Sequence, residues 1–296
     1  MFRFMFRSIL FACLAVSCLR AQESGESGRF TFEGRLQGSR NSLGNVTRLD
    51  TSAGYLFTRH WSLSFGVPYY FVNPSSSTQA STGTSPFNGV GNVFSELRFA
   101  LSNPLANYVS TVTGTAPTGD RDRGLSTGHA TVDWSNYVER GFGPLTPFGE
   151  VGIANAVSDT QFFVRPYTSY GFVTHAQGGA RHRLVRWMNV GASAYLIQPS
   201  GQQTVVSRVV TKRGPANAAV PGVGRGLLKQ VFETESVATG SADIARDHGF
   251  STFATLGVRS SLNVYAGYTR STRYNLDTVF FGVGFRIRRS LGVGGL

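Results

Sequence analysis

Residues 61–69 read Trp-Ser-Leu-Ser-Phe-Gly-Val-Pro-Tyr, a stretch in which every second side chain is large and apolar. Successive side chains of a β-strand point to opposite faces, so this period of two predicts a strand with one apolar face. The pattern returns near the C-terminus in residues 279–287, Val-Phe-Phe-Gly-Val-Gly-Phe-Arg-Ile, where alternate residues are again large and apolar. Both stretches therefore predict strands whose second face carries small, polar or charged residues.

The period of two occurs in twelve segments of the chain. We expect strands at residues 28–37, 46–57, 61–72, 92–101, 107–116, 128–139, 145–155, 168–180, 187–197, 249–258, 261–270 and 277–288. Pro68 and Pro147 fall inside two of them and are expected at bulges or strand starts, because proline donates no ladder hydrogen bond. The composition agrees with an all-β protein, since 36 residues are Gly and 12% are aromatic. It is too apolar for a disordered chain, and no apolar run reaches the ~20 residues of a membrane-spanning helix.

The links between the expected strands alternate in length. Links after the even-numbered strands are short, whereas most links after the odd-numbered strands are longer: 38–45, 73–91, 117–127, 156–167, 198–248 and 271–276. Short turns at one end and long loops at the other are typical of outer-membrane barrels. The sequence therefore predicts an all-β fold, a transmembrane up-and-down antiparallel β-barrel of about twelve strands, with ten or fourteen as alternatives. The short turns are expected on the periplasmic side.

The N-terminus has the features of a secretory signal. Arg3 and Arg7 precede an apolar stretch, and Ala21 offers a small residue for cleavage. Cys13 and Cys18, the two cysteines of the chain, lie in this segment, so the mature chain has neither disulfides nor thiolate metal sites. The expected organisation is a signal peptide at 1–21, a polar leader at 22–27, a barrel at 28–288 with a long external loop at 198–248, and a C-terminal extension at 289–296.

The polar face of the strands carries many charges. In a lipid-facing barrel this face points into the lumen, and burying an unpaired ion would cost several kcal/mol, so a wet lumen is expected. The candidate pore-lining residues are Glu33, Arg35, Arg48, Asp50, Glu96, Arg98, Asp133, Glu150 and Arg286. They form either a polar ladder that fills the lumen or a constriction that selects solutes by charge. Twelve strands predict a narrow lumen.

Four short motifs resemble one known family. They are Pro-Thr-Gly-Asp at 117–120 followed by a basic loop and Thr-Gly at 127–128, Gly-Phe-Val-Thr-His at 171–175, Gly-Ala-Ser-Ala-Tyr at 191–195, and Asn-Leu-Asp-Thr at 275–278. They are similar to the outer-membrane proteins called the "MetA-pathway of phenol degradation" family. The resemblance implies an outer-membrane barrel that acts as a transporter or channel, and it implies no defined substrate.

The expected function is passage of small solutes, small apolar or aromatic compounds among them, across the outer membrane of a Gram-negative type envelope. No enzymatic activity, cofactor or metal is expected, because no metal-binding motif occurs in the mature sequence. One alternative is an outer-membrane lipid hydrolase in which His60 activates Ser62. His129 lies near Ser126 and Asp133 in the sequence, but neither residue is two positions from it, as Ser62 is from His60. The other alternative is a structural or adhesion barrel.

An outer-membrane barrel is expected to have several partners. Outer-membrane lipids and lipopolysaccharide are expected, and loop 198–248 is either a contact for lipopolysaccharide phosphates or a solvated loop. No nucleic acid is expected, although the formal net charge is +12. The barrel assembly machinery is expected to engage the closing strand through Phe280, Gly282, Phe285 and Ile287. Replacing the inward Ser64 or Gly282 by Ala is expected to be tolerated better than replacing the outward Phe65 or Val283 by Arg.

Overall fold

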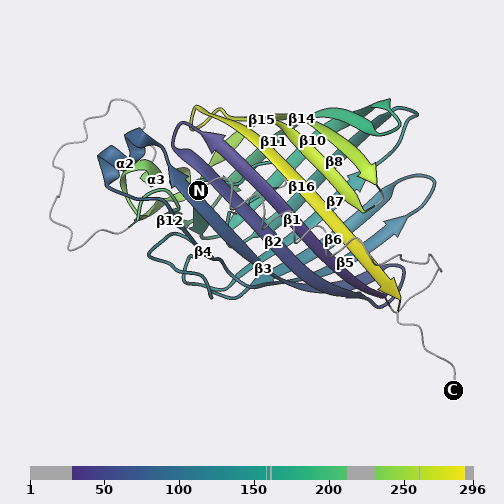
Figure 1. The fold of residues 1–296 in the computed structure, drawn as a ribbon, viewed down its shortest axis with the longest axis horizontal. Helices are drawn as coiled ribbons and strands as arrows, with labels where there is room; N and C mark the ends of the chain where they lie inside the picture. The colour runs from purple at the N-terminus through teal and green to yellow at the C-terminus, as the bar shows by residue number, and fades with distance from the viewer. Residues whose placement is uncertain (1–28, 158, 161, 212–230, 260, 291–296) are drawn as a thin grey trace, which may run out of the picture.

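Twelve long antiparallel strands form the wall of the molecule in the computed structural model (Figure 1). They are β1 (Arg29–Asn41), β2 (Gly44–Leu56), β3 (Trp61–Pro74), β5 (Phe94–Ser102), β6 (Asn107–Thr115), β7 (Thr131–Glu139), β8 (Leu145–Ala154), β10 (Val173–Val185), β11 (Met188–Pro199), β14 (Asp247–Arg259), β15 (Leu262–Ser271) and β16 (Leu276–Ser290). Each strand pairs with its neighbours in the chain, and β1 also pairs with β16, which closes the barrel. The predicted fold class and strand number are confirmed.

The structure describes residues 29–157, 159–160, 162–211, 231–259 and 261–290. The predicted signal peptide 1–21 and leader 22–27 lie outside these residues. β16 continues to Ser290, two residues into the predicted C-terminal extension, because Arg289 and Ser290 still pair with Phe30 and Arg29 of β1.

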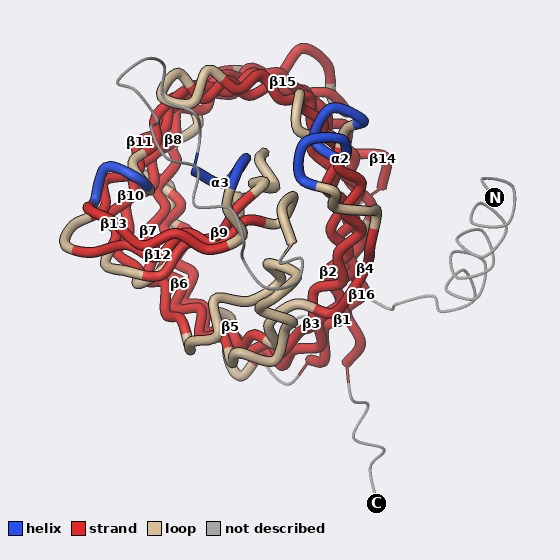
Figure 2. Tube along the Cα trace, turned by 90° about the vertical axis from the view of Figure 1, so that its left-hand side faces the viewer, coloured by secondary structure: helices blue, strands red, loops and turns tan. Residues whose placement is uncertain are grey.

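One end of the barrel carries the longer connections and is called the loop end; the opposite end is called the turn end. The smaller elements of the loop end are α2 (Ser76–Thr82), β4 (Phe87–Val90), β9 (Tyr167–Tyr170), β12 (Gln202–Ser207), α3 (Val231–Thr234), β13 (Val237–Ser241) and the 3-10 helix η1 (Ala242–Ile244). β9, β12 and β13 form a separate three-stranded sheet. Figure 2 looks at the loop end and shows β9 and β12 running across the mouth of the barrel.

Two connections of the loop end are shorter than the sequence predicts. β1 and β2 are joined by residues 42–43 instead of 38–45, and β15 and β16 by residues 272–275. The Asn41 side chain accepts a hydrogen bond from the Leu43 N–H (3.0 Å) and so closes the first turn. The hydrogen-bonded ladder continues through polar residues after the apolar alternation has stopped. For this reason the sequence pattern underestimates the length of these strands.

Pro68 and Pro147 lie where the pairing on one edge of their strand is interrupted or begins. β3 pairs with β5 through Gly66 and with β4 from Tyr69 onward, so that Pro68 falls in the gap between the two ladders. Pro147 is the third residue of β8, just before the pairing of β8 with β7 begins at Phe148. Both positions agree with the expected bulge or strand start, since proline has no N–H to donate there.

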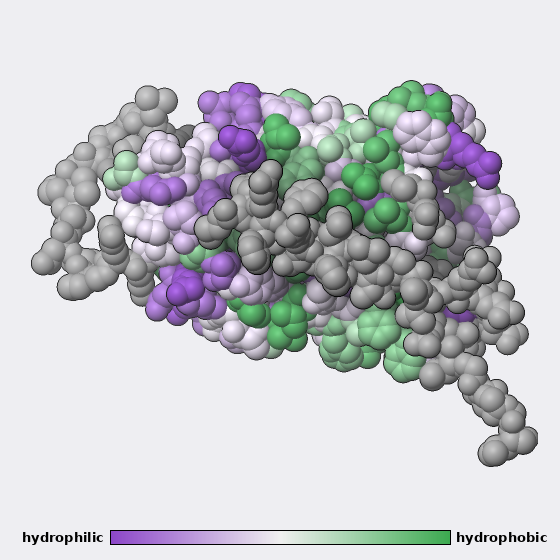
Figure 3. Space-filling view, in the orientation of Figure 1, coloured by the Kyte–Doolittle hydropathy of each residue, from purple (hydrophilic) through white to green (hydrophobic). Residues whose placement is uncertain are grey.

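The outer face of the barrel is apolar. Large hydrophobic side chains remain exposed along the strands, among them Phe30, Phe32, Trp61, Phe65, Leu97, Val112, Val132, Trp134, Val151, Ile153, Val279, Phe281 and Phe285. Figure 3 shows hydrophobic side chains along the wall and hydrophilic side chains gathered toward the ends. Exposed apolar area on this scale is unusual for a soluble protein and is typical of a lipid-facing barrel.

The inner face of β14, β15 and β16 holds aromatic rings above glycines. A Cβ added to Gly282 would lie 2.0 Å from Cζ of Tyr265. The Tyr265 ring is only 2% exposed, and its hydroxyl donates a hydrogen bond to Gln37 Oε1 (3.2 Å). An alanine would displace this buried ring, so Gly282→Ala is expected to be costly; whether it is tolerated better than an outward arginine stays a prediction. The alternation of residues shows that Gly282 faces inward but not that a ring lies over it.

Candidate functional site

The barrel encloses a cavity of about 1530 Å³ that extends from the turn end to the loop-end elements. The nine charged residues expected in the lumen all line it: Glu33, Arg35, Arg48, Asp50, Glu96, Arg98, Asp133, Glu150 and Arg286. Many of the other lining residues carry hydroxyl groups, among them Thr31, Ser52, Ser62, Ser64, Thr111, Thr113, Thr115, Thr131 and Ser135. The cavity is therefore rich in charged and hydroxyl groups, whereas the outer wall is apolar.

One wall of the cavity carries a mixed cluster dominated by arginine. Arg286 of β16 forms an ion pair with Glu33 of β1. Glu96 of β5 interacts electrostatically with Arg35, Glu33, Arg98 and Arg286. Arg35 is exposed to the cavity and forms no hydrogen bond or ion pair within the part of the chain that the structure describes. Its guanidinium group is thus available to a solute in the cavity.

Small residues make room for this cluster. β2 and β3 separate β1 from β5, and at this height they present Ser52, Gly54, Ser64 and Gly66 to the interior. In the register of the sheet, Glu33 pairs with Ser52 and Glu96 with Ser64. Long charged side chains from β1 and β5 therefore extend toward one another over two strands that lack bulky inward groups.

The opposite wall is acidic. β8 is the sixth strand from β1 in either direction around the ring, so Glu150 lies across the lumen from Glu33 and Arg35. His175 of β10 contacts Asp133 of β7 (Nε2 to Oδ1, 3.2 Å) and lies 4.0 Å from Glu150. The imidazole reaches β7 across Gly152, where a Cβ would lie 2.3 Å from its Nε2 atom. His175 was not among the residues expected in the lumen, although this residue falls on the inward face two residues before Gln177.

The segment 155–172 links β8 to β10 and is called the inserted loop; its described residues, all but 158 and 161, fold into the barrel. Phe162 stacks on Phe253 of the inner wall, with 4.3 Å between ring centroids. Its carbonyl accepts a hydrogen bond from the Thr269 hydroxyl (3.2 Å), and the Val164 N–H donates to Ser39 Oγ (2.9 Å). The inserted loop is therefore fixed to the inner face of β1, β14 and β15.

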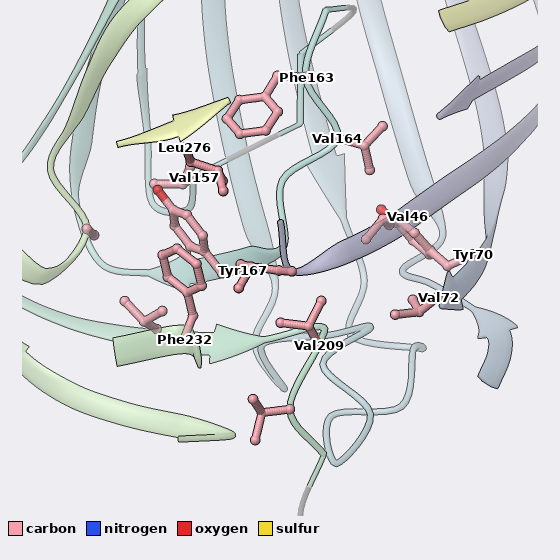
Figure 4. Close-up of a cluster of buried hydrophobic side chains, with 14 of the residues drawn as sticks. Val46, Tyr70, Val72, Val157, Phe163, Val164, Tyr167, Val209, Phe232 and Leu276 are labelled. Carbon is pink, nitrogen blue, oxygen red and sulfur yellow. The ribbon is translucent and has the colours of Figure 1, made fainter. Parts of the chain in front are cut away.

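An apolar core fills the loop end of the barrel above the cavity. Tyr167 of β9 stacks on Phe232 of α3, with ring centroids 4.6 Å apart, and both side chains are almost completely buried (Figure 4). Other buried members come from the barrel wall and the loops, namely Val46, Tyr70, Val72, Val164, Val173, Ile197, Val205, Val209 and Leu276. The inserted loop, β12, α3 and residues 208–210 are called the plug. Parts of the predicted external loop 198–248 are thus packed into the barrel mouth.

Asp159 connects the plug to the wall through buried charges. Its carboxylate accepts hydrogen bonds from Arg208 Nη1 (2.6 Å) and from Arg48 Nη1 of β2 (3.3 Å). The Tyr70 hydroxyl (3.2 Å) and the Arg165 N–H (2.9 Å) donate to it as well. The Asp159 side chain is 2% exposed. Its pKa lies below the ordinary value, because the two guanidinium groups outweigh the effect of burial, which alone would raise the pKa.

The lowered pKa gives the direction of a pH dependence. A carboxyl whose folded pKa is depressed contributes stability above its unfolded pKa of about 3.9 and loses it as pH falls through the folded value. We therefore expect the closed inserted loop to keep its stability from pH 7 to about 5 and to lose it progressively as pH falls below about 3.9. Hydrogen exchange of the peptide that contains Arg165, corrected for intrinsic rates, measures this loss of stability. Asp159→Asn should abolish the acid transition, and an unchanged transition in that variant would assign it to other carboxyls.

The histidine–serine pair considered for a lipid hydrolase is not assembled. His60 Nδ1 contacts the Ala100 carbonyl oxygen (2.8 Å), and Arg59 Nε donates to His60 Nε2 (2.8 Å). Both ring nitrogens are thus engaged elsewhere, and no hydrogen bond joins His60 to Ser62 in the described structure. His129 stacks on Tyr170 (4.3 Å between ring centroids), while Asp133 contacts His175.

Nowhere in the described ranges do three or more His, Cys, Asp or Glu side chains gather in a way that could hold a metal ion. None of their helices is long and apolar enough to cross a membrane.

Comparison with known proteins identifies similar folds and no family. No family model and no curated protein matches the chain, so the resemblance to the "MetA-pathway of phenol degradation" family stays a prediction. The solved NanC porin has a TM-score of 0.47 and 11% identity, covering 86% of this chain and 100% of that one. The KdgM porin solved with oligogalacturonate has a TM-score of 0.46 and 9% identity, covering 86% and 98%. An outer membrane channel from Pseudomonas putida F1 has a TM-score of 0.51 and 14% identity, covering 92% of this chain and 98% of that one, and therefore shares its fold.

Proposed function

We propose that the chain is an outer-membrane channel for small polar or charged solutes, with a plug that restricts passage at its loop end. The observation that carries this proposal is a closed barrel that is apolar outside and encloses a cavity lined by charges and hydroxyl groups. A soluble barrel has the reverse distribution of polar and apolar residues. The fold shared with an outer membrane channel agrees with this proposal.

The lining supports polar solutes more than the apolar or aromatic compounds that the sequence analysis includes. Arg35 and Arg98 lie on one wall, and Asp133 and Glu150 lie on the opposite wall. A solute in this lumen meets cationic groups on one side and anionic groups on the other. Such an arrangement orients a dipolar or zwitterionic molecule.

Ion selectivity in planar bilayers tests the channel. Replacing Arg35 and Arg98 by Gln is expected to shift the reversal potential toward cation selectivity, because Glu33, Glu96, Asp133 and Glu150 remain. The shift should decrease strongly at ~1 M salt, where the Debye length falls to about 3 Å. Replacing Glu33 and Glu96 by Gln should move the reversal potential in the opposite direction.

Arg123→Gln is the matched control, because this loop-end arginine is exposed and pairs with Asp120 (3.4 Å) away from the cavity. Its selectivity should equal that of the unmodified protein. If neither the unmodified protein nor a plug-released variant conducts ions, the channel proposal fails and a structural barrel becomes the better account. Lipid hydrolysis lost in Ser62→Ala would instead support the hydrolase.

A further inference from the structure

Several arginines of the loop end have carboxylate partners. They are Arg123 with Asp120 (3.4 Å), Arg246 with Asp243 (3.0 Å) and Arg270 with Asp277 (2.7 Å). Arg40 and Arg121 of the same end are exposed and form no ion pair with any described residue, so the positive charge of the loop end is partly neutralised within the described protein.

The turn end holds exposed arginines without such partners. Arg140, Arg183 and Arg186 are exposed, and their side chains form no ion pair or hydrogen bond with any residue that the structure describes. Glu139, the carboxylate nearest in sequence, is already paired with Arg181. Three cations at this place therefore have no counter-charge from the described protein.

These arginines belong to two adjacent turns. Arg140 follows β7, whereas Arg183 and Arg186 lie at the turn between β10 and β11. β8 pairs with β10 up to its first residue, Leu145, and the Arg183 N–H donates to the Pro144 carbonyl (2.8 Å). The two turns consequently lie side by side at the turn end.

Large apolar side chains lie among the same arginines. Phe142 and Leu184 are each 53% exposed, and Trp187 is 58% exposed. The guanidinium of Arg140 lies over the Phe142 ring, 4.9 Å from its centroid. Leu145, also exposed, continues this apolar surface into the outer wall of β8. Cations and aromatic rings are therefore placed together where the apolar wall ends.

We propose that this corner, formed by Arg140, Phe142, Arg183, Leu184, Arg186 and Trp187, binds the phosphate headgroups of anionic phospholipids. Guanidinium groups bind phosphate oxygens in bidentate geometry, and aromatic side chains are enriched at the headgroup level of a bilayer. An acidic protein would match the cations but would leave exposed rings beside the lipid-facing wall unexplained. The inference rests on the proposed membrane location and adds a lipid partner on the side of the short turns.

Native mass spectrometry of the full-length protein in neutral detergent tests the site, with phosphatidylglycerol and phosphatidylcholine as probes. Phosphatidylglycerol is expected to bind more tightly, and Arg140→Gln, Arg183→Gln and Arg186→Gln together should weaken it by about fivefold for each arginine removed. The triple substitution of Arg123, Arg246 and Arg270 to Gln is the control, because it changes net charge equally. It should retain the lipid. Heat-modifiable migration on gels verifies that each barrel is folded.

Other outcomes would overturn the proposal. Equal binding of the two lipids would show that the corner does not recognise anionic headgroups. An equal loss of phosphatidylglycerol binding in both triple variants would show a nonspecific effect of net charge. Arginine-dependent binding of a polyglutamate peptide without phosphatidylglycerol binding would assign the corner to an acidic protein. Competition by millimolar inorganic phosphate alone would indicate an anion site and not a lipid site. Conductance of the turn-end triple variant in neutral bilayers should stay unchanged, so failure here leaves the channel proposal standing.

Discussion

Replacing Asp159 by Asn is expected to release the inserted loop and to increase the conductance of the purified barrel. The substitution leaves Arg208 and Arg48 buried without their shared carboxylate. Removing one partner of a buried ion pair costs about 3–5 kcal/mol. Since every 1.4 kcal/mol is tenfold, the ratio of open to closed loop should rise by about a hundredfold or more. Single-channel recording at neutral pH should show more frequent or larger open levels.

Two further variants distinguish the loss of the Asp159 ion pairs from a general destabilisation of the barrel. Asp243→Asn removes a carboxylate whose pair with Arg246 is exposed, and it should leave conductance unchanged because such pairs contribute at most about 1 kcal/mol. Arg208→Gln added to Asp159→Asn removes the unpaired charge and should restore part of the closure. If Asp159→Asn accelerates hydrogen exchange of the inserted loop without changing conductance, the inserted loop is not the barrier to ion passage.

The barrel could be predicted because its pattern is local. Within β1, Glu33 and Arg35 alternate with Phe32 and Gly34, and the pleat of a strand alone then places the two charges on the cavity side. Nothing distant in the sequence is needed to assign the face. The limits of the pattern are also local, since β1 and β2 continue as paired strands after the apolar alternation stops, as far as Asn41 and Gly44.

The plug could not be predicted because its contacts are distant in sequence and have no period. Asp159 contacts Arg208, 49 residues away, and Arg48, 111 residues away. Phe162 stacks on Phe253, although its neighbours in the chain show neither helical nor strand spacing. Residues 155–172 and 198–248 look like loops for this reason, and only the folded barrel brings their buried groups together.

The charged clusters of the lumen could be predicted in part from the sequence. Their charged members follow from alternation, but the contacts depend on small residues of intervening strands. His175 reaches Asp133 because Gly152 lies between them, and the register that sets this alignment is fixed by pairing with β8. Once strand register is known, inward glycines become a signal for a side chain that crosses a neighbouring strand.

A charge on the outer wall is expected to damage assembly far more than the same charge on the inner wall. Phe65, which is 57% exposed, lies halfway between Trp61 and Tyr69 of β3, so Phe65→Arg places a guanidinium near the expected bilayer midplane. That position costs about 2–4 kcal/mol in a transmembrane barrel. Thr113→Arg is the control, because this inward side chain of β6 lines the cavity beside Glu96 and is not one of the small residues that make room for the charged cluster. Denaturant titration in lipid vesicles measures both free energies of unfolding. Equal losses at the two positions would contradict a lipid-facing wall, whereas a loss confined to Phe65→Arg would assign the two faces as described.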